Sequence, residues 1–162
     1  MNSDNRAMIR VREADGNDLD AVVEIGRRTW PATNGELYDP DFVPLFLDKW
    51  WTKDACIPSI RAGRTMVAQA GDEVVGMASY GPLEGRQIVW KLYVLPDWQG
   101  RGVGGQLLGA VLERIGHQPT FMSFAAGNDS AARFTRSVGF VEDHREPQTD
   151  MPDLVWMRRD PT

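Results

Sequence analysis

Residues 92–105 read LYVLPDWQGRGVGG. Residues 92–95 have the composition of a strand, Pro96 ends it, and an apolar helical stripe begins at Val103 after a loop rich in glycine. The first amides of a helix have no partner within the helix and carry partial positive charge, so they bind anions. Glycine lets the backbone approach such a ligand closely. The segment therefore predicts a phosphate-binding loop, with pyrophosphate as the expected ligand.

Two known phosphate-binding patterns overlap in this loop. Gly100, Gly102 and Gly105 fit the dinucleotide pattern G-x-G-x-x-G. That pattern also needs an acidic residue at the end of the next strand, and residues 120–126 contain none. The Gly-Lys-Ser/Thr run of the nucleoside triphosphate loop is also missing from the sequence. The sequence therefore argues against a dinucleotide-binding domain and against a nucleoside triphosphate-binding loop.

The remaining sequence alternates between helical and strand patterns and is expected to form a single domain, residues 1–162. Polar residues 1–7 are expected to be a flexible tail. Gly71 and Asp72 join two β-rich runs in the manner of a hairpin. Hydrophobic spacing predicts helices over 15–30, 42–51, 103–115 and 128–138, and strands near 8–12, 65–70, 73–80, 87–95, 120–126, 140 and 154–158.

Composition narrows the classes of function. The 162 residues include 18 Lys and Arg against 23 Asp and Glu, and a net charge of -5 argues against a general nucleic-acid binder. The single cysteine, Cys56, excludes an internal disulfide and a cysteine-rich zinc site and fits a reducing compartment. Residues 1–12 lack the apolar run of a signal peptide, and no run of 18 apolar residues occurs. We therefore expect a cytoplasmic protein without a membrane span and without a bound metal.

Residues 99–104, QGRGVG, resemble the Q/R-x-x-G-x-G signature of the GCN5-related N-acetyltransferase (GNAT) family. Residues 128–134, NDSAARF, and the pair Gly139-Phe140 resemble a second segment of that family at the expected spacing. The resemblance implies an α/β (α+β) fold with a mixed central sheet of about six to seven strands and about four flanking helices. It also implies a V-shaped splay between two central parallel strands, here residues 87–95 and 120–126.

The resemblance further implies acetyl-CoA as co-substrate and assigns its parts to residues. Backbone groups of residues 92–94 would pair with pantetheine like an added strand, and an amide there would polarise the thioester carbonyl. Loop amides would hold the pyrophosphate, and the residue that opens the helix at 128 would contact the pantetheine arm. The implied coenzyme-binding residues are Leu92, Tyr93, Val94, Gln99, Gly100, Arg101, Gly102, Val103, Gly104, Gly105 and Asn128.

Acetyl transfer needs a neutral amine, and so a proton acceptor is useful. Relatives often carry a glutamate on a central strand, where this chain offers Ile88, Trp90 and Ser123, and a tyrosine acid where it has Thr135. Water relayed by backbone groups is the leading mechanism by elimination. The candidate side chains are His144, Glu36 and Tyr93, with Glu84 and Tyr80 as further options.

The resemblance also implies that the acceptor enters between the loop that joins the first two helices and the loop that joins the last two strands. Both regions are acidic, which favours a cationic small amine or polyamine, unless these charges are merely solvated. A protein amino group is an alternative acceptor, and a non-catalytic acyl-CoA sensor is an alternative function. Homodimers are common among relatives, so a homodimer stays open. Trp30, Trp50 and Trp51 either line the acceptor pocket or belong to the core or a dimer interface.

Overall fold

A computed structural model describes residues 8–161, and the expected flexible tail at 1–7 lies outside the described residues. Seven strands form one mixed sheet in the order β1-β2-β3-β4-β5-β7-β6. In chain order the elements are β1 (Ile9–Glu13), η1 (Gly16–Asp18), α2 (Leu19–Asn34), α3 (Phe42–Trp50), α4 (Lys53–Arg61), β2 (Thr65–Ala70), β3 (Glu73–Leu83), β4 (Arg86–Val94), η2 (Pro96–Trp98), α5 (Val103–Ile115), β5 (Thr120–Ala125), α6 (Asp129–Ser137), β6 (Val141–Gln148) and β7 (Met151–Arg159).

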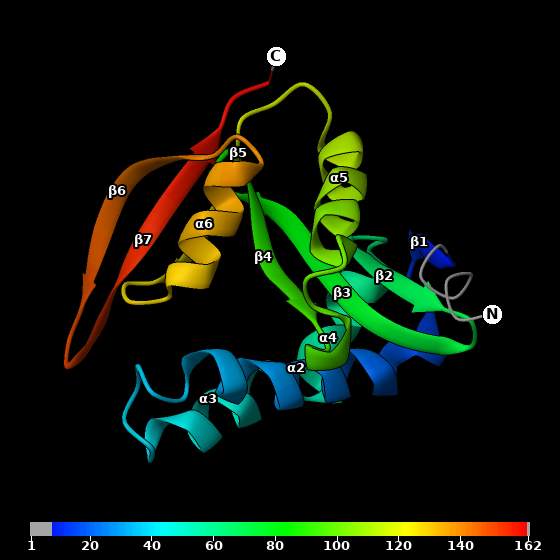
Figure 1. The fold of residues 1–162 in the computed structure, drawn as a ribbon, viewed down its shortest axis with the longest axis horizontal. Helices are drawn as coiled ribbons and strands as arrows, with labels where there is room; N and C mark the ends of the chain where they lie inside the picture. Colours follow the sequence, from blue (N-terminus) through cyan, green and yellow to red (C-terminus); the bar gives the residue numbers. More distant parts are fainter. Residues whose placement is uncertain (1–7, 162) are drawn as a thin grey trace.

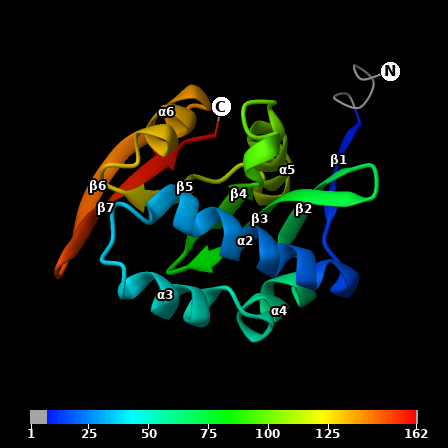
Figure 2. The ribbon, with the colours of Figure 1, turned by 60° about the horizontal axis from the view of Figure 1, so that its bottom comes forward.

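Helices cover the sheet from both sides (Figures 1 and 2). On one face α5 packs on strands β1 to β4, and α6 lies over β5 and β7. On the other face α2 packs on β3 and β4, with α3 and α4 beside it. The apolar stripe predicted for α5 is confirmed, because Leu107, Leu108 and Val111 are fully buried.

The predicted V-shaped splay lies between β4 and β5. These parallel strands pair only at Gln87 with Thr120 and at Ile88 with Phe121. Beyond that point β4 continues to Val94 without pairing to β5, and the two strands diverge (Figure 1). The sheet thus opens toward the ends of both strands, next to the start of α5.

A bulge in β4 sets which side chains face which helices. Ser79 pairs with Lys91 and Tyr80 pairs with Val89, so Trp90 is an extra residue on β4. Side chains alternate along a strand, and an extra residue reverses the alternation. Val89 therefore joins the main core, whereas Ile88 lies buried apart from it on the face that Lys91 and Tyr93 share.

The structure differs from the predicted helices at two places. The predicted helix 15–30 runs on through Pro31 to Asn34, with Thr29 and Trp30 buried. The predicted helix 42–51 ends at Trp50, and a further helix, α4, follows with Thr52 as its cap. Burial of the apolar faces outweighs the local effect of proline in α2.

Two of the three tryptophans with an open role belong to the interior. Trp51 is 1% exposed, and a Cβ on Gly26 would lie 2.0 Å from its ring. Trp30 is 4% exposed and stacks on Phe46 with ring centroids 4.2 Å apart. Trp50 is 45% exposed at the end of α3.

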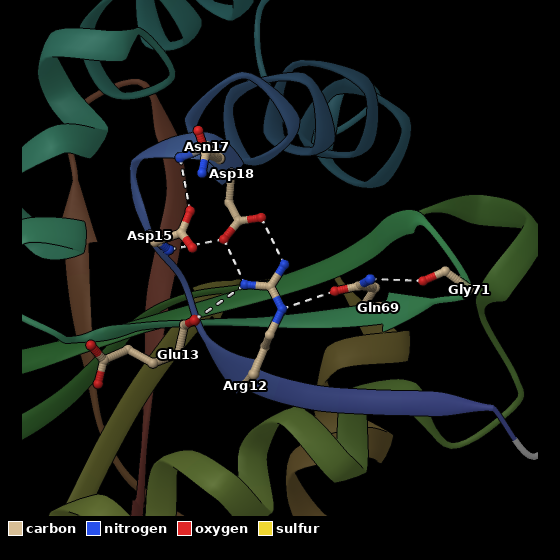
Figure 3. A network of polar contacts seen from close by, with 7 residues as sticks. All are labelled: Arg12, Glu13, Asp15, Asn17, Asp18, Gln69 and Gly71. Atoms are coloured by element: carbon tan, nitrogen blue, oxygen red, sulfur yellow. Dashed lines mark hydrogen bonds and ion pairs between the residues drawn. The ribbon is translucent and has the colours of Figure 1, made fainter.

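A polar network ties β1 to the start of α2 (Figure 3). The Arg12 guanidinium donates to both carboxylate oxygens of Asp18, at 2.7 and 2.9 Å, and to Gln69 on β2 at 2.8 Å. Asp18 also accepts from the backbone N–H of Asp15 and closes a capping box at η1. The hydrogen bonds from Arg12 lower the pKa of the buried Asp18 carboxyl. This network fixes the outer end of α2 to the edge of the sheet.

Candidate functional site

The glycine-rich loop leaves β4 through η2 and enters α5 at Gly102. Gly100 and Gly102 have φ angles of 76° and 83°, a region that side chains with a Cβ rarely adopt. The first backbone hydrogen bond into the helix runs from Gln106 N–H to the Gly102 carbonyl. The amides of residues 103–105 come before it and so have no partner within the helix. They form the partial positive charge that a pyrophosphate needs.

The outer side of this loop is open. A Cβ at Gly100, Gly102 or Gly105 would meet no atom within 4 Å, whereas one at Gly104 would touch the Phe134 ring at 3.6 Å. Gln99 anchors the loop, because its Nε2 donates to the Val94 carbonyl at 2.9 Å. The loop therefore presents its backbone to solvent beside the end of β4.

Backbone groups on the splayed side of β4 have no strand partner. Leu92 pairs with Ala78 and Tyr93 with Met77, both on β3, and neither pairs with β5. Strand backbones present hydrogen-bonding groups alternately to each side, so part of this edge faces the gap. An extended ligand can add to such an edge as a strand would.

Asn128 lies across the splay at the start of α6. Its Oδ1 accepts from the Ala131 N–H at 3.1 Å, which confirms it as the N-cap. Two turns after Asn128, Thr135 is fully buried, and its hydroxyl donates to the Ala131 carbonyl at 2.9 Å. The Thr135 hydroxyl is thus engaged within its own helix and does not replace an exposed tyrosine acid.

The segment between α2 and α3 spans the open end of the splay. A Cβ on Gly127, which follows β5, would lie 2.9 Å from Leu37 Cδ2, so Leu37 packs against the turn before α6. Tyr38 faces Gln148 near the tip of the β6–β7 hairpin, and its ring lies 5.3 Å from Trp30. These contacts join the two loops that the sequence assigned to the acceptor entrance.

Two partly buried tyrosines face this entrance. Burial is the main reason that the pKa of Tyr93 is raised far above its ordinary value, and the nearby Tyr38 raises it further. Burial also raises the pKa of Tyr38, and its contact with Gln148 partly offsets that rise. Both hydroxyls therefore remain protonated near neutral pH and can act as hydrogen-bond donors.

The three predicted catalytic side chains lie in different places. Tyr93 is on β4 beside the splay, Glu36 is exposed on the α2–α3 segment, and His144 is exposed on β6. His144 stacks on Trp156 with ring centroids 6.0 Å apart, and its Nδ1 lies 2.6 Å from Asp143 Oδ2. Within residues 8–161 no hydrogen bond or ion pair joins these three residues. Two further side chains were candidates for the catalytic role. Tyr80 lies beside Arg114 of α5, and Glu84 lies in the β3–β4 turn.

A partly buried lysine next to the splay is absent from the sequence-based predictions. Lys91 Nζ donates to the Trp50 carbonyl at 2.8 Å, lies 3.7 Å from Cys56 Sγ and stands 3.9 Å from the Trp51 ring centre. Burial lowers the pKa of Lys91, and the Cys56 thiol acts in the opposite direction. Through the Trp50 carbonyl, the Lys91 ammonium caps the C-terminal end of α3. Its position follows from the turn between α3 and α4, for which the sequence offered no separate signal.

Comparison with known proteins agrees with this geometry. A family model described as an acetyltransferase (GNAT) domain matches residues 61–142, a range that includes the splay strand β4, the glycine loop and α6. The chain belongs to the GNAT family. Its mixed seven-stranded sheet, split between β4 and β5, is the GNAT fold.

Relatives of this GNAT chain include enzymes with different acceptors in their names. The N-alpha-acetyltransferase RimI of Mycobacterium tuberculosis is 30% identical over 148 residues, 88% of this chain and 83% of that protein. The L-methionine sulfoximine/L-methionine sulfone acetyltransferase of Pseudomonas paraeruginosa is 35% identical over 100 residues, 57% of this chain. The aligned part spans 58% of that second relative's length.

A solved structure shows the same fold as this GNAT chain. The PaiA N-acetyltransferase of Thermoplasma acidophilum, described in complex with coenzyme A, superposes with a TM-score of 0.81 over 94% of this chain and 98% of that one. Its sequence identity of 16% restricts the likeness to the fold.

Two absences apply to the described part of the GNAT chain. No helix within residues 8–161 has the length and apolar character needed to cross a membrane. In the same residues no three side chains of His, Cys, Asp or Glu are grouped so that they could share a metal ion.

Proposed function

We propose that this protein is an N-acetyltransferase that transfers the acetyl group of acetyl-CoA to a primary amine. The observation that carries the proposal is the position of three features around one gap. These are the unpaired edge of β4, the open glycine loop at the start of α5, and Asn128 at the start of α6. Names of the relatives support the same reaction class.

The coenzyme would lie along the gap with its diphosphate on the loop. Amides of residues 103–105 would bind the phosphate oxygens, and Arg101, which stacks on Trp98, would add positive charge at the rim. Pantetheine would pair with the backbone of residues 92–94, so the thioester would reach the middle of the splay. A backbone N–H there would stabilise the oxyanion of the tetrahedral intermediate.

The amine would enter from the face of α2, under the α2–α3 segment. Tyr93 is the side chain best placed to protonate the leaving thiolate, because it belongs to the strand segment that would pair with pantetheine and its phenol stays protonated. Tyr38 would donate a hydrogen bond to the acceptor from the opposite wall. Water that contacts backbone carbonyls would remove the proton of the amine, and His144 and Glu36 stay as candidate bases.

Acidic residues at both loops favour a cationic acceptor. Glu36 and Asp39 are exposed on the α2–α3 segment, and Asp150 stands at the tip of the β6–β7 hairpin. Their potential would attract an ammonium group to the entrance. A small amine or polyamine is therefore the proposed acceptor, and an N-alpha amino group of a polypeptide is the second candidate because one relative is named for that reaction.

The decisive experiment measures thiol release from acetyl-CoA with purified protein and three acceptor sets: simple amines, polyamines and short peptides with free amino termini. Turnover with at least one set supports the enzyme, and mass spectrometry of the product identifies the acetylated nitrogen. Tight binding of acetyl-CoA by calorimetry without thiol release in any set would favour the non-catalytic acyl-CoA sensor. Failure to bind acetyl-CoA at all would end both hypotheses.

A further inference from the structure

We infer that a hollow on the uncovered face of β5, β6 and β7 holds a second positively charged group of the acceptor. The hollow, of about 180 Å³, lies beside the point where β4 and β5 still pair. Its floor is Ile88 and Phe121, which are buried apart from the main core. This inference rests on the proposed acetyl transfer and specifies the class of acceptor.

The hollow and the acceptor entrance lie on one face of the sheet. Val155 and Met157 of β7 are buried in the core under α6, so Trp156 between them points to the other face. Trp156 pairs with Ser123 of β5, whose neighbour on the same face two positions earlier is Phe121. The Trp90 bulge puts Ile88 on the face that carries Tyr93. A molecule can therefore extend from the splay into the hollow without crossing the sheet.

Two carboxylates give the hollow its preference for a cation. Trp156 Nε1 donates to Glu146 Oε1 at 3.1 Å, which orients that carboxylate and leaves its second oxygen without a protein partner among the described hydrogen bonds. Glu84 lines the hollow from the β3–β4 turn. Arg86 lies over the Phe121 ring at 4.9 Å, and Arg158 on the same ring is paired with Asp160. Since His144 is bound to Asp143, the lining offers more negative than positive charge.

The length of the acceptor follows from strand geometry. The thioester would lie near residues 92 and 93, and Ile88 in the floor of the hollow lies four to five positions back along β4. Because the bulged Trp90 adds no length to the paired strand, this separation corresponds to three to four residues, or roughly 10–13 Å at about 3.3 Å per residue. A flexible α,ω-diamine with about eight carbons, or a triamine of the same length, fits this distance. Its methylene chain would lie on Ile88 and Trp156, and its far ammonium would bind Glu146 and Glu84.

Kinetics with matched acceptors test the inference. We expect kcat/KM to be about tenfold higher for diaminooctane than for diaminobutane and for aminooctanol, which has the same length but lacks the second charge. Glu146→Gln should remove most of that preference through a higher KM for diaminooctane. Glu142→Gln, on the same strand but outside the hollow, should keep it. Equal rates for diaminooctane and aminooctanol in the unaltered protein would overturn the inference.

A binding measurement separates this inference from the proposed function. In NMR spectra the Trp156 indole N–H should shift when diaminooctane is added to the complex with coenzyme A, whereas the exposed Trp50 indole N–H should not. A Trp156 shift without turnover of any amine would support diamine binding in the hollow and contradict the proposed acetyltransferase activity. Turnover of simple amines without a Trp156 shift would support the acetyltransferase and reject the hollow.

Discussion

Gly102 and Gly116 bound the same helix, and both have positive φ angles, of 83° and 78°. A Cβ at either position would meet no atom within 4 Å, but Gly102 is left-handed with ψ 4°, whereas Gly116 has ψ -146°, a region that is almost restricted to glycine. Alanine at Gly102 therefore strains the folded backbone by about 1 kcal/mol, and alanine at Gly116 strains it more. We expect only Gly102→Ala to weaken coenzyme A binding, by about tenfold, because only Gly102 presents its neighbouring amides to the diphosphate.

Calorimetric titration of both variants with coenzyme A measures this difference, and thermal unfolding without ligand provides the control. An affinity loss confined to Gly102→Ala, although Gly116→Ala loses more stability, would support the phosphate loop. Unchanged affinity in Gly102→Ala would remove that assignment.

Tyr93 and Tyr80 allow a matched test of the proposed acid. Tyr93 faces the splay, whereas Tyr80 lies beside Arg114 of α5, away from it. Tyr93→Phe should lower kcat by about 10- to 100-fold with little change in the KM for acetyl-CoA, because the backbone contacts remain. Tyr80→Phe should retain kcat.

The pH profile gives a second readout for Tyr93. Since burial raises its pKa above the ordinary value near 10, its deprotonation should cause no loss of kcat below about pH 10. A decline in kcat near pH 8 that disappears in Tyr93→Phe would contradict the environment described for this phenol.

At the scale of single elements, α6 depends on one residue for its start. Asn128 Oδ1 caps the helix, while its amide nitrogen is proposed to contact pantetheine. Asn128→Ala should cost about 1 kcal/mol of unfolding free energy and also weaken coenzyme binding. Asn128→Ser keeps a capping oxygen, so it should retain the stability and lose only affinity. Denaturant unfolding and calorimetry together distinguish the two roles, and full affinity in Asn128→Ser would exclude the pantetheine contact.

The junction of β1 with α2 predicts a dependence of stability on pH. Because Arg12 lowers the folded-state pKa of Asp18, this pair adds stability above the unfolded value near 3.9 and loses it as the pH falls through the lower folded value. Asp18→Asn should reduce the unfolding free energy at pH 7 by about 2 kcal/mol. The difference from the unaltered protein should shrink below about pH 4. A difference that stays constant down to pH 2 would contradict this linkage.

Elements with strong local signals were predictable, and elements created by pairing were not. The α5 stripe, the β2–β3 hairpin and the glycine loop each have a local sequence pattern, and the structure confirms them. Strand β6 has seven exposed residues out of eight and is held by pairing with β7, so the sequence predicted a strand near 140 but not its extent to Gln148. The extent of α2 beyond Pro31 depends on buried contacts that only the tertiary fold supplies.

The candidate site also contains residues that a local motif predicts and residues that only the tertiary fold brings together. The family motifs located the glycine loop and Asn128, because those roles depend on backbone geometry that few residues satisfy. Tyr38, Lys91 and Trp156 escaped notice, because their environments arise from segments far apart in the sequence.

At the scale of the whole molecule, the sheet consists of two parts joined by few contacts. Strands β1 to β4 form one part and β5 to β7 the other, and only two register pairs connect β4 with β5. A coenzyme that touches β4, the loop and α6 would tie both parts together. At one hundred times its dissociation constant, a ligand adds about 2.7 kcal/mol of stability.

That gain corresponds to a rise of roughly 5–10 °C in Tm for a chain of this size. Differential scanning fluorimetry with coenzyme A at such a concentration checks the value. Adenosine alone, which lacks both diphosphate and pantetheine, serves as the control and should produce a much smaller shift. Equal Tm shifts from the two compounds would show that simultaneous contact of coenzyme A with both parts of the sheet adds nothing to stability.

The bulge at position 90 makes the register of β4 as important as its composition. If Trp90 paired regularly with Tyr80 instead of bulging, every residue before it would shift by one position along β3, so that Ile88 would leave the acceptor face and Val89 would leave the core. Such a slip would exchange interior and surface along the first half of this strand. Deleting Trp90, by contrast, would leave Val89 opposite Tyr80 and Ile88 opposite Gly81, so a relative that lacks this residue would keep the same acceptor wall with a regular strand.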